Sequence, residues 1–197
     1  MSGIKIGVLA LQGAVREHLK MLERCGARGI AVKYPSELLS CDGLIIPGGE
    51  STTIGKLIVR DGFLETLRER ASLDLPVYGT CAGLIVLAKR VTEGQQPLLG
   101  LMDILVRRNA YGRQVDSFEA DLAVNGIEEA ERPFRAIFIR APWIEEAGEG
   151  VEVMCTHDDR VVMARQGRFL AGAFHPELTD DDRIHRYFLR MVEEYKA

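Results

Sequence analysis

The sequence predicts one α/β domain, a three-layer α/β/α arrangement with a mixed, mostly parallel sheet between two layers of helices. Three observations lead to this prediction. Short apolar runs rich in β-branched residues alternate with helical segments through the first ninety residues, which is typical of a doubly wound sheet. Shorter runs of alternating polarity follow and suggest antiparallel additions to the sheet. No Ser-rich or Pro-rich linker interrupts the chain, so we expect a single domain over residues 1–197.

The first half of the chain supplies the expected parallel strands, at residues 4–11, 43–46 and 75–78. Apolar residues recur at helical spacing in three segments around these strands. We expect the second helical segment to be interrupted near Asp61-Gly62. The residues that set the spacing are Val15, Leu19 and Leu22 in the first segment, Ile54, Leu57, Ile58, Leu64 and Leu67 in the second, and Leu84, Ile85, Leu87 and Ala88 in the third.

The second half predicts shorter strands and a closing helix. The strands are expected at residues 104–107, 118–124, 136–139, 151–155, 161–164 and 169–174. Residues 180–195 begin with acidic side chains and continue with an apolar stripe at helical spacing. We therefore expect a final amphipathic helix that packs on the sheet.

The composition excludes several classes of protein. With 47% hydrophobic and 27% charged residues, the chain is neither disordered nor collagen-like. Its 25 Lys and Arg against 29 Asp and Glu give a net charge of -4, which offers no broad positive field to nucleic acid or an anionic membrane. We expect a small or locally recognised partner.

Cysteine usage and the N-terminal sequence favour a cytoplasmic protein. No CxxC or Cys/His cluster indicates structural zinc, and we expect neither a metal nor a cofactor. The apolar start contains Lys5 and is unlike a signal peptide, and no apolar run approaches the ~20 residues of a spanning helix. The thiols are therefore expected to be reduced and unpaired. They belong to Cys25, Cys41, Cys81 and Cys155.

The segment G-T-C-A-G at residues 79–83 has the glycine spacing of a nucleophile elbow and lies between an expected strand and an apolar helix. Such a turn would expose the Cys81 thiol at a helix N-terminus, which favours the thiolate, and would aim the Ala82 amide at a developing oxyanion. An inert buried cysteine is the alternative for any cytosolic thiol. The strand, turn and helix context favours the nucleophile for Cys81, and the other three cysteines lack this context.

A cysteine nucleophile needs a base, and His175 is the best candidate among four histidines. It follows an apolar strand, and Glu177 lies two residues on, where in an extended segment its carboxylate can orient the imidazole. Pro176 is expected to keep the pair extended. Taken alone, the tripeptide could also be a solvated turn. The other histidines are expected as surface or packing residues of helices, or in a polar turn: His18, His185 and His157.

The loop P-G-G-E at residues 47–50 presents backbone amides without bulky side chains, which suits an oxyanion hole or a small polar substrate. A phosphate cradle is a weaker alternative, because the G-x-x-x-x-G-K-[ST] pattern is missing and Glu50 adds a negative charge. An ordinary turn with Ser51 or Thr52 capping the next helix is compatible with the functional interpretation.

Taken in this order, the segments resemble the class I, or triad, glutamine amidotransferases, which implies a flavodoxin-like fold. Within that class the chain is most similar to the family of glutaminase subunits of pyridoxal 5'-phosphate synthases. The blocks at residues 108–122 and 139–142 are more specific to this family than the triad, which many amidotransferases share. The motifs that carry the resemblance are L-A-L-Q-G-A-V-R-E-H, P-G-G-E-S-T-T, G-T-C-A-G-L-I, R-N-A-Y-G-R-Q-V-D-S-F-E-A-D-L, I-R-A-P and F-H-P-E-L.

The resemblance implies a role for each site residue. Cys81 would be the nucleophile, His175 the general base and acid, and Glu177 the residue that orients the imidazole. Glutamine would be held with its α-ammonium on Glu50 and its α-carboxylate on an arginine. The implied glutamine-binding residues are Gly49, Glu50, Ser51, Arg108, Ile139 and Arg140, and the implied oxyanion hole comprises Gly48, Gly49 and Ala82.

The resemblance also implies a partner, a separate barrel-shaped synthase subunit that receives ammonia and builds pyridoxal phosphate from ribose 5-phosphate and glyceraldehyde 3-phosphate. Docking would activate the glutaminase by reorganising the Gly48-Gly49 loop. Two alternatives stand at this point. A glutaminase serving a chorismate- or purine-using synthase is disfavoured by the block at residues 108–122. A non-catalytic binding or regulatory module is disfavoured by the complete set of Cys81, His175 and Glu177.

Overall fold

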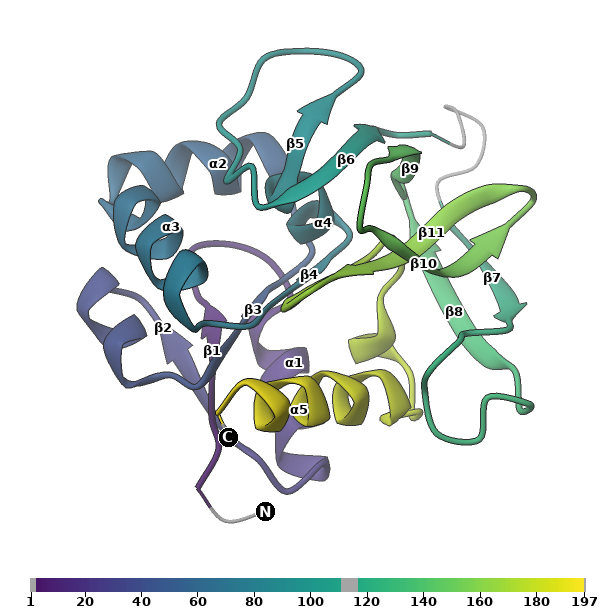
Figure 1. Cartoon of the computed structure of the whole chain (residues 1–197), viewed down its shortest axis with the longest axis horizontal. Helices are drawn as coiled ribbons and strands as arrows, with labels where there is room; N and C mark the ends of the chain where they lie inside the picture. The colour runs from purple at the N-terminus through teal and green to yellow at the C-terminus, as the bar shows by residue number, and fades with distance from the viewer. Residues whose placement is uncertain (1–2, 111–116, 197) are drawn as a thin grey trace.

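In the computed structural model, which describes residues 3–110 and 117–196, the chain folds around a curved ten-stranded sheet (Figure 1). One half of this sheet is parallel throughout. Strand β1 lies between β2 and β3, so the loops that follow β1 and β3 leave the sheet at its topological switch point. In spatial order, this half consists of β2 (Arg28–Val32), β1 (Lys5–Leu9), β3 (Gly43–Ile46), β4 (Val77–Thr80) and β12 (Phe169–Gly172).

The other half of the sheet is mixed. It continues from β12 through β11 (Arg160–Gln166), β9 (Trp143–Ala147), β6 (Met102–Arg107) and β5 (Ala88–Val91), and β10 (Glu152–His157) pairs with β11. These pairings are antiparallel except for that of β5 with β6. Strands β7 (Ser117–Leu122) and β8 (Phe134–Ile139) form a separate antiparallel pair.

Helices cover both faces of the parallel half, as Figure 1 shows. On one face lie α1 (Val15–Arg24) and α5 (Arg183–Lys196), and on the other lie α2 (Ser51–Arg60), α3 (Phe63–Leu73) and α4 (Ala82–Leu87). Phe188 of α5 packs on the Tyr78 ring of β4 at 5.6 Å between centroids. Two 3-10 turns, η1 (Pro35–Ser40) and η2 (Pro176–Leu178), complete the elements, and one continuous apolar core joins them.

The predicted α/β class and mostly parallel sheet are confirmed, and so is the interruption at Gly62, which adopts a left-handed conformation before α3. Several local predictions were wrong. Residues 28–32 and 143–147 form strands that were not expected. Strand β12 runs parallel to β4, whereas β7 and β8 pair only with each other among the strands of the described residues. The helix expected to include Ala88 ends at Leu87, and Ala88 begins β5.

These local predictions failed for a common reason. Each of these features depends on an element that packs beside it and not on the local sequence alone. Strand β2 lies at the edge of the sheet with most of its residues partly exposed, so its sequence lacks the apolar run of a central strand. Helix α5, in contrast, has a strong local signal, and its predicted stripe is buried. The middle of the block at residues 108–122, residues 111–116, lies outside the described residues.

No helix within residues 3–110 and 117–196 is both long and apolar enough to span a membrane.

Candidate active site

Cys81 lies in the sharp turn between β4 and α4. Its backbone has φ 50° and ψ -102°, a left-handed conformation that a residue with a Cβ rarely adopts. The Cys81 amide donates to the Gly172 carbonyl at 2.7 Å, which attaches the turn to the end of β12. Both flanking glycines are sterically required. A Cβ at Gly79 would meet the Gly83 backbone, and one at Gly83 would meet the Ile46 backbone.

His175 and Glu177 come to this turn from the end of β12. The His175 Nδ1 lies 2.7 Å from the Glu177 Oε1, and the His175 amide donates to the Ile137 carbonyl of β8. The pair is not extended as expected, since Pro176 starts the 3-10 turn η2. The carboxylate nevertheless reaches the imidazole because the turn folds Glu177 back beneath it. Both side chains are buried, with residue exposures of 7% and 6%.

The imidazole of His175 lies beside Cys81 and is hydrogen-bonded to Glu177. Burial opposes its protonation, but interactions with Cys81 and with the Glu177 carboxylate outweigh burial and raise the pKa of His175 to about 10. The Cys81 Sγ also lies 3.8 Å from the Ile139 carbonyl. Cys81 and the His175–Glu177 pair, which lie far apart in the sequence, are therefore side by side, an arrangement that suits a nucleophile with an oriented base.

The Gly48-Gly49 loop is packed directly against this arrangement. A Cβ at Gly48 would overlap the His175 imidazole and approach the Cys81 Cβ, so only glycine fits there. The Gly48 amide donates to the Thr80 hydroxyl at 3.1 Å, and the Gly48 carbonyl accepts from the Ala14 amide. In this conformation the Gly48 amide is thus engaged by Thr80, and it is not offered to an oxyanion at Cys81 as the sequence led us to expect.

The expected glutamine-binding side chains are only partly brought together. The Glu50 carboxylate caps α2 through the Thr52 and Thr53 amides, and Arg108 Nη2 lies 3.5 Å from Glu50 Oε1. These hydrogen bonds hold the pKa of Glu50 below its ordinary value although partial burial opposes the shift. The charges predicted to bind a zwitterion therefore face each other.

The four further residues of that prediction differ in their surroundings. The Ser51 hydroxyl donates to the Gln96 side chain at 3.2 Å and is buried. Ile139 contributes its carbonyl near Cys81, and the residue is exposed. Arg140 is exposed and has a positive φ of 44°. Gly49 is exposed beside Gln12, whose side-chain oxygen accepts from the Glu50 amide.

Sequence reasoning missed a buried polar cluster behind Glu177. His18 of α1 and His185 of α5 are fully buried, so the surface alternative is wrong for both. His18 Nε2 lies 3.1 Å from the Thr80 Oγ1 and 3.5 Å from the Glu177 Oε2. A signal was available, because His18 falls between Val15 and Leu22 on the apolar face of its helix. His157 is at the end of β10 rather than in a turn, stacked on aromatic rings.

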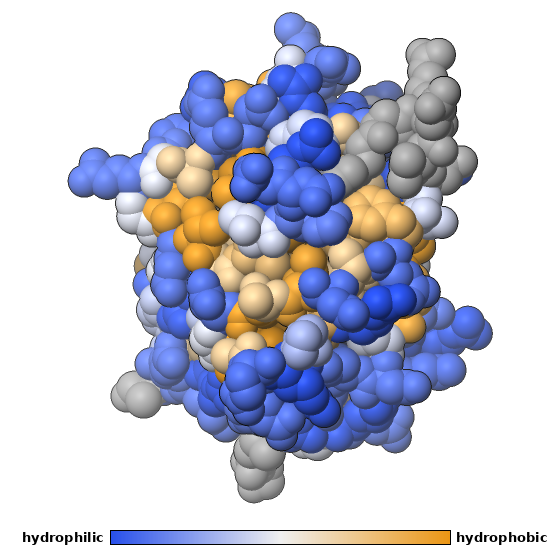
Figure 2. Space-filling view, turned by 90° about the vertical axis from the view of Figure 1, so that its right-hand side faces the viewer, coloured by the Kyte–Doolittle hydropathy of each residue, from blue (hydrophilic) through white to orange (hydrophobic). Residues whose placement is uncertain are grey.

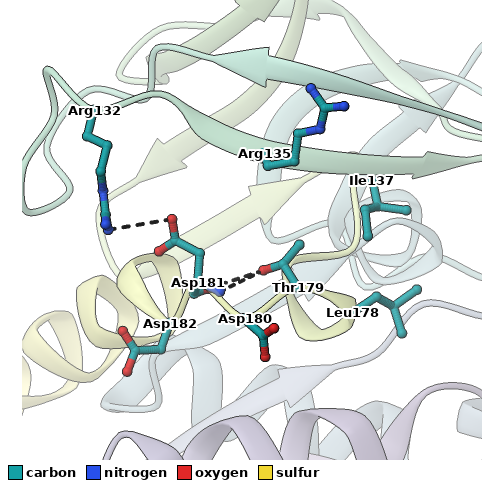
Figure 3. A pocket seen from close by; sticks show the side chains of 8 residues that line it. All are labelled: Arg132, Arg135, Ile137, Leu178, Thr179, Asp180, Asp181 and Asp182. Carbon is teal, nitrogen blue, oxygen red and sulfur yellow. Dashed lines mark hydrogen bonds and ion pairs between the residues drawn. The ribbon is translucent and has the colours of Figure 1, made fainter.

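A groove of about 520 Å³ begins at Leu178, directly after Glu177, but Cys81, His175 and Glu177 do not line it. Figure 3 shows the side chains that line this groove. Its two arginines are already paired, Arg132 with Glu129 and Asp181, and Arg135 with Glu119 and Asp121. Figure 2 shows hydrophobic residues gathered at the centre of one face of the molecule with hydrophilic residues around them. The groove is lined by Arg132, Arg135, Ile137, Leu178, Thr179, Asp180, Asp181 and Asp182.

Comparison with known proteins gives consistent results along the whole chain. Residues 8–194 match the model of the SNO glutamine amidotransferase family. The chain is similar to the pyridoxal 5'-phosphate synthase subunit PdxT of Geobacillus kaustophilus, with 56% identity over 98% of this chain and 97% of the relative. It is also similar to PdxT of Pelotomaculum thermopropionicum, with 59% identity over 94% of each.

Solved structures agree with these relatives. A crystal structure described as a glutamine amidotransferase superposes with a TM-score of 0.91 at 48% identity, covering 97% of this chain and all of the other. The structure of PurLQS from Thermotoga maritima, at 16% identity and a TM-score of 0.72 over the full length of both chains, shares the fold.

Proposed function

The chain belongs to the SNO glutamine amidotransferase family, and on this premise we propose that it hydrolyses L-glutamine through Cys81, His175 and Glu177 and passes the ammonia to a synthase subunit. Its relatives carry the name of a pyridoxal 5'-phosphate synthase subunit, and the chain acts as the glutaminase subunit of such a synthase. The observation that carries the proposed chemistry is the hydrogen-bonded His175–Glu177 pair at 2.7 Å beside the strained turn of Cys81.

Each member of the triad has a defined step. His175 takes the thiol proton, and the Cys81 sulfur attacks the glutamine carboxamide carbon. His175 then gives that proton to the leaving nitrogen, so that ammonia departs and a thioester remains. Water, deprotonated by His175, attacks the thioester, glutamate leaves, and the proton returns to sulfur. Glu177 stabilises the imidazolium at each stage, consistent with the raised pKa of His175.

We assign the glutamine backbone to the rim of the site. Glu50 would bind the α-ammonium and Arg108 the α-carboxylate, so glutamine would enter between two side chains that now face each other at 3.5 Å. A zwitterion can replace their mutual contact because it presents the complementary charge to each. The remaining residues of this proposed pocket are Gly49, Ser51, Ile139 and Arg140.

The oxyanion would be stabilised by amides of Ala82 and of the Gly48-Gly49 loop. The bond between the Gly48 amide and Thr80 supports a need for reorganisation of that loop before full activity. We propose that docking of the synthase subunit, which is a barrel-shaped protein, drives this change, since a glutaminase without an acceptor would waste its product.

Two wider features complete the proposal. Residues 1–197 form one glutamine amidotransferase domain, supported by the continuous apolar core of the described residues. The protein acts in the cytoplasm, supported by four cysteines that are all unpaired.

The test is a reconstitution with the synthase subunit, both sugar phosphates and either glutamine or ammonium. Wild-type protein should support pyridoxal phosphate formation from both nitrogen sources, and Cys81→Ala from ammonium alone. An unchanged glutamine reaction in Cys81→Ala would overturn the nucleophile. Hydrolysis of glutamine that never feeds this synthase would overturn the acceptor and favour a different amidotransferase, whereas absence of hydrolysis in the reconstituted complex would favour a non-catalytic module.

A further inference from the structure

A buried polar cluster with no assigned role lies directly behind Glu177. His18 and His185 are fully buried, and His18 Nδ1 lies 3.0 Å from His185 Nε2. The other ring nitrogen of His18 lies 3.1 Å from Thr80 Oγ1 and 3.5 Å from Glu177 Oε2. These side chains come from α1, α5, β4 and the segment after β12, so one helix layer and the sheet meet at the carboxylate.

Glu177 has two oxygens with different surroundings. Oε1 is bonded by His175, whereas Oε2 has no hydrogen bond within the described residues and faces His18 Nε2. A buried carboxylate oxygen without a hydrogen-bond donor costs folding free energy. His18 Nε2, 3.5 Å from Oε2, therefore determines how firmly the carboxylate is held.

The contacts select one protonation pattern for the two imidazoles. If His18 Nε2 were unprotonated, its lone pair would face the carboxylate oxygen, which is repulsive. With the proton on Nε2, His18 presents an N–H to Thr80 and Glu177, and its Nδ1 accepts from His185 Nε2. The Nδ1 of His185, which has no hydrogen-bond partner in the described part of the chain, is then an acceptor and not an orphaned N–H donor, which is the less costly arrangement. Burial lowers the pKa of both histidines, that of His185 to about 3, which favours the neutral form of each ring.

We propose that His18 is a positioning residue for the reaction, whose Nε2–H holds the free oxygen of Glu177 and so fixes the carboxylate that orients His175. His185 keeps His18 in the required tautomer by donating to its Nδ1. Because Thr80 Oγ1 contacts both His18 and the Gly48 amide, the same cluster connects the carboxylate with the Gly48-Gly49 loop. This inference rests on the proposed function, since it concerns the base of that reaction.

Two amide substitutions test the role of the Nε2 position. The Gln amide reaches the place of the imidazole Nε2 and can donate there, whereas the shorter Asn amide reaches only the place of Nδ1. In the complex with the synthase subunit, His18→Gln should keep kcat for glutamine hydrolysis within about threefold of wild type, and His18→Asn should lower it by about 10-fold to 100-fold, as for misplaced catalytic groups. KM should change less than about twofold in both, because His18 does not line the proposed substrate site.

A spectroscopic readout separates positioning from a purely structural role. The His175 Nδ1 proton, held by Glu177 at 2.7 Å, should give a downfield proton resonance in the full chain. It should persist in His18→Gln and shift or broaden in His18→Asn. His157→Gln is the matched control, since His157 stacks on Phe118 and Phe138 and should leave the resonance and kcat unchanged.

The proposal is overturned if His18→Asn and His18→Gln have equal kcat and an unshifted resonance. It is also overturned if both variants lose activity equally in proportion to a lowered unfolding temperature. Lack of turnover in the wild-type complex would instead reject the proposed function, and the resonance in the isolated chain would still decide the role of His18.

Discussion

The proposed reacting centre, which consists of Cys81, His175 and Glu177, and the proposed recognition rim, which consists of Glu50 and Arg108, are built in opposite ways. Cys81, His175 and Glu177 are buried, His175 is hydrogen-bonded to Glu177, and two further buried imidazoles lie behind this pair. At the rim, Glu50 and Arg108 are partly exposed and contact each other. The difference teaches that the fold fixes the chemistry in advance, whereas substrate recognition requires existing contacts to be exchanged. Substitutions at the centre should therefore reduce kcat, and those at the rim should raise KM.

The largest effect is expected for His175→Asn, which removes the base and acid from the centre. By analogy with other triads, kcat for glutamine hydrolysis should fall by about a millionfold. Intact-mass measurement should find no thioester on Cys81. Ammonium-dependent product formation in the complex is the control and should be unchanged. A thioester formed at the wild-type rate would show that the centre is not organised around His175.

Glu177→Gln should cost about a hundredfold less than His175→Asn, because the amide keeps part of the orienting contact. The variant should also lower the pKa of His175, which stands at about 10 partly through Glu177. An NMR titration of His175 measures this shift. A pKa that stays near 10 would mean that Glu177 does not act on the imidazole.

The same pair predicts a pH dependence of stability. A histidine whose folded pKa is raised above its unfolded value of about 6.5 contributes stability that is full below that pH and is lost as pH rises toward 10. Urea unfolding of wild type should therefore show a loss over this window. The loss should be smaller in Glu177→Gln, and an equal loss in the two proteins would contradict the assignment.

Gly48→Ala should reduce kcat by about a hundredfold through displacement of the His175 imidazole, which the new Cβ would overlap. This substitution tests whether the loop and the centre are as tightly packed as they are in the structure. Steady-state kinetics of the complex measure the effect, and thermal unfolding of the variant provides the control for folding. Activity within twofold of wild type would show that the loop has room to move away.

The smallest kinetic effect is expected at the rim. Arg108→Gln should raise KM for glutamine by about 10-fold and leave kcat nearly unchanged, since it removes one charge-assisted contact. Arg107→Gln is the matched control, because Arg107 pairs with Glu145 instead. Equal KM increases in both variants would remove the reason for assigning Arg108 to the substrate.

The sequence was informative where a feature depends on neighbours along the chain. The turn at Cys81 and the His175-Glu177 spacing are local patterns, and both groups were found in one centre. The contacts of His18 and His185 depend on helices at opposite ends of the chain, so periodicity could indicate their burial but not their partners. Edge strand β2 and the parallel pairing of β12 likewise depend on neighbours in space.

The left-handed backbone of Cys81 implies that the protein gives up stability in exchange for its reaction. A residue with a Cβ in such a conformation costs about 1–3 kcal/mol, and glycine avoids most of that strain. In regular structure glycine is normally more destabilising than alanine, by roughly 0.5–1 kcal/mol. Here the order should invert, so that chemical denaturation finds Cys81→Gly more stable than Cys81→Ala. The nucleophile would then occupy a position that selection for folding alone would have assigned to glycine.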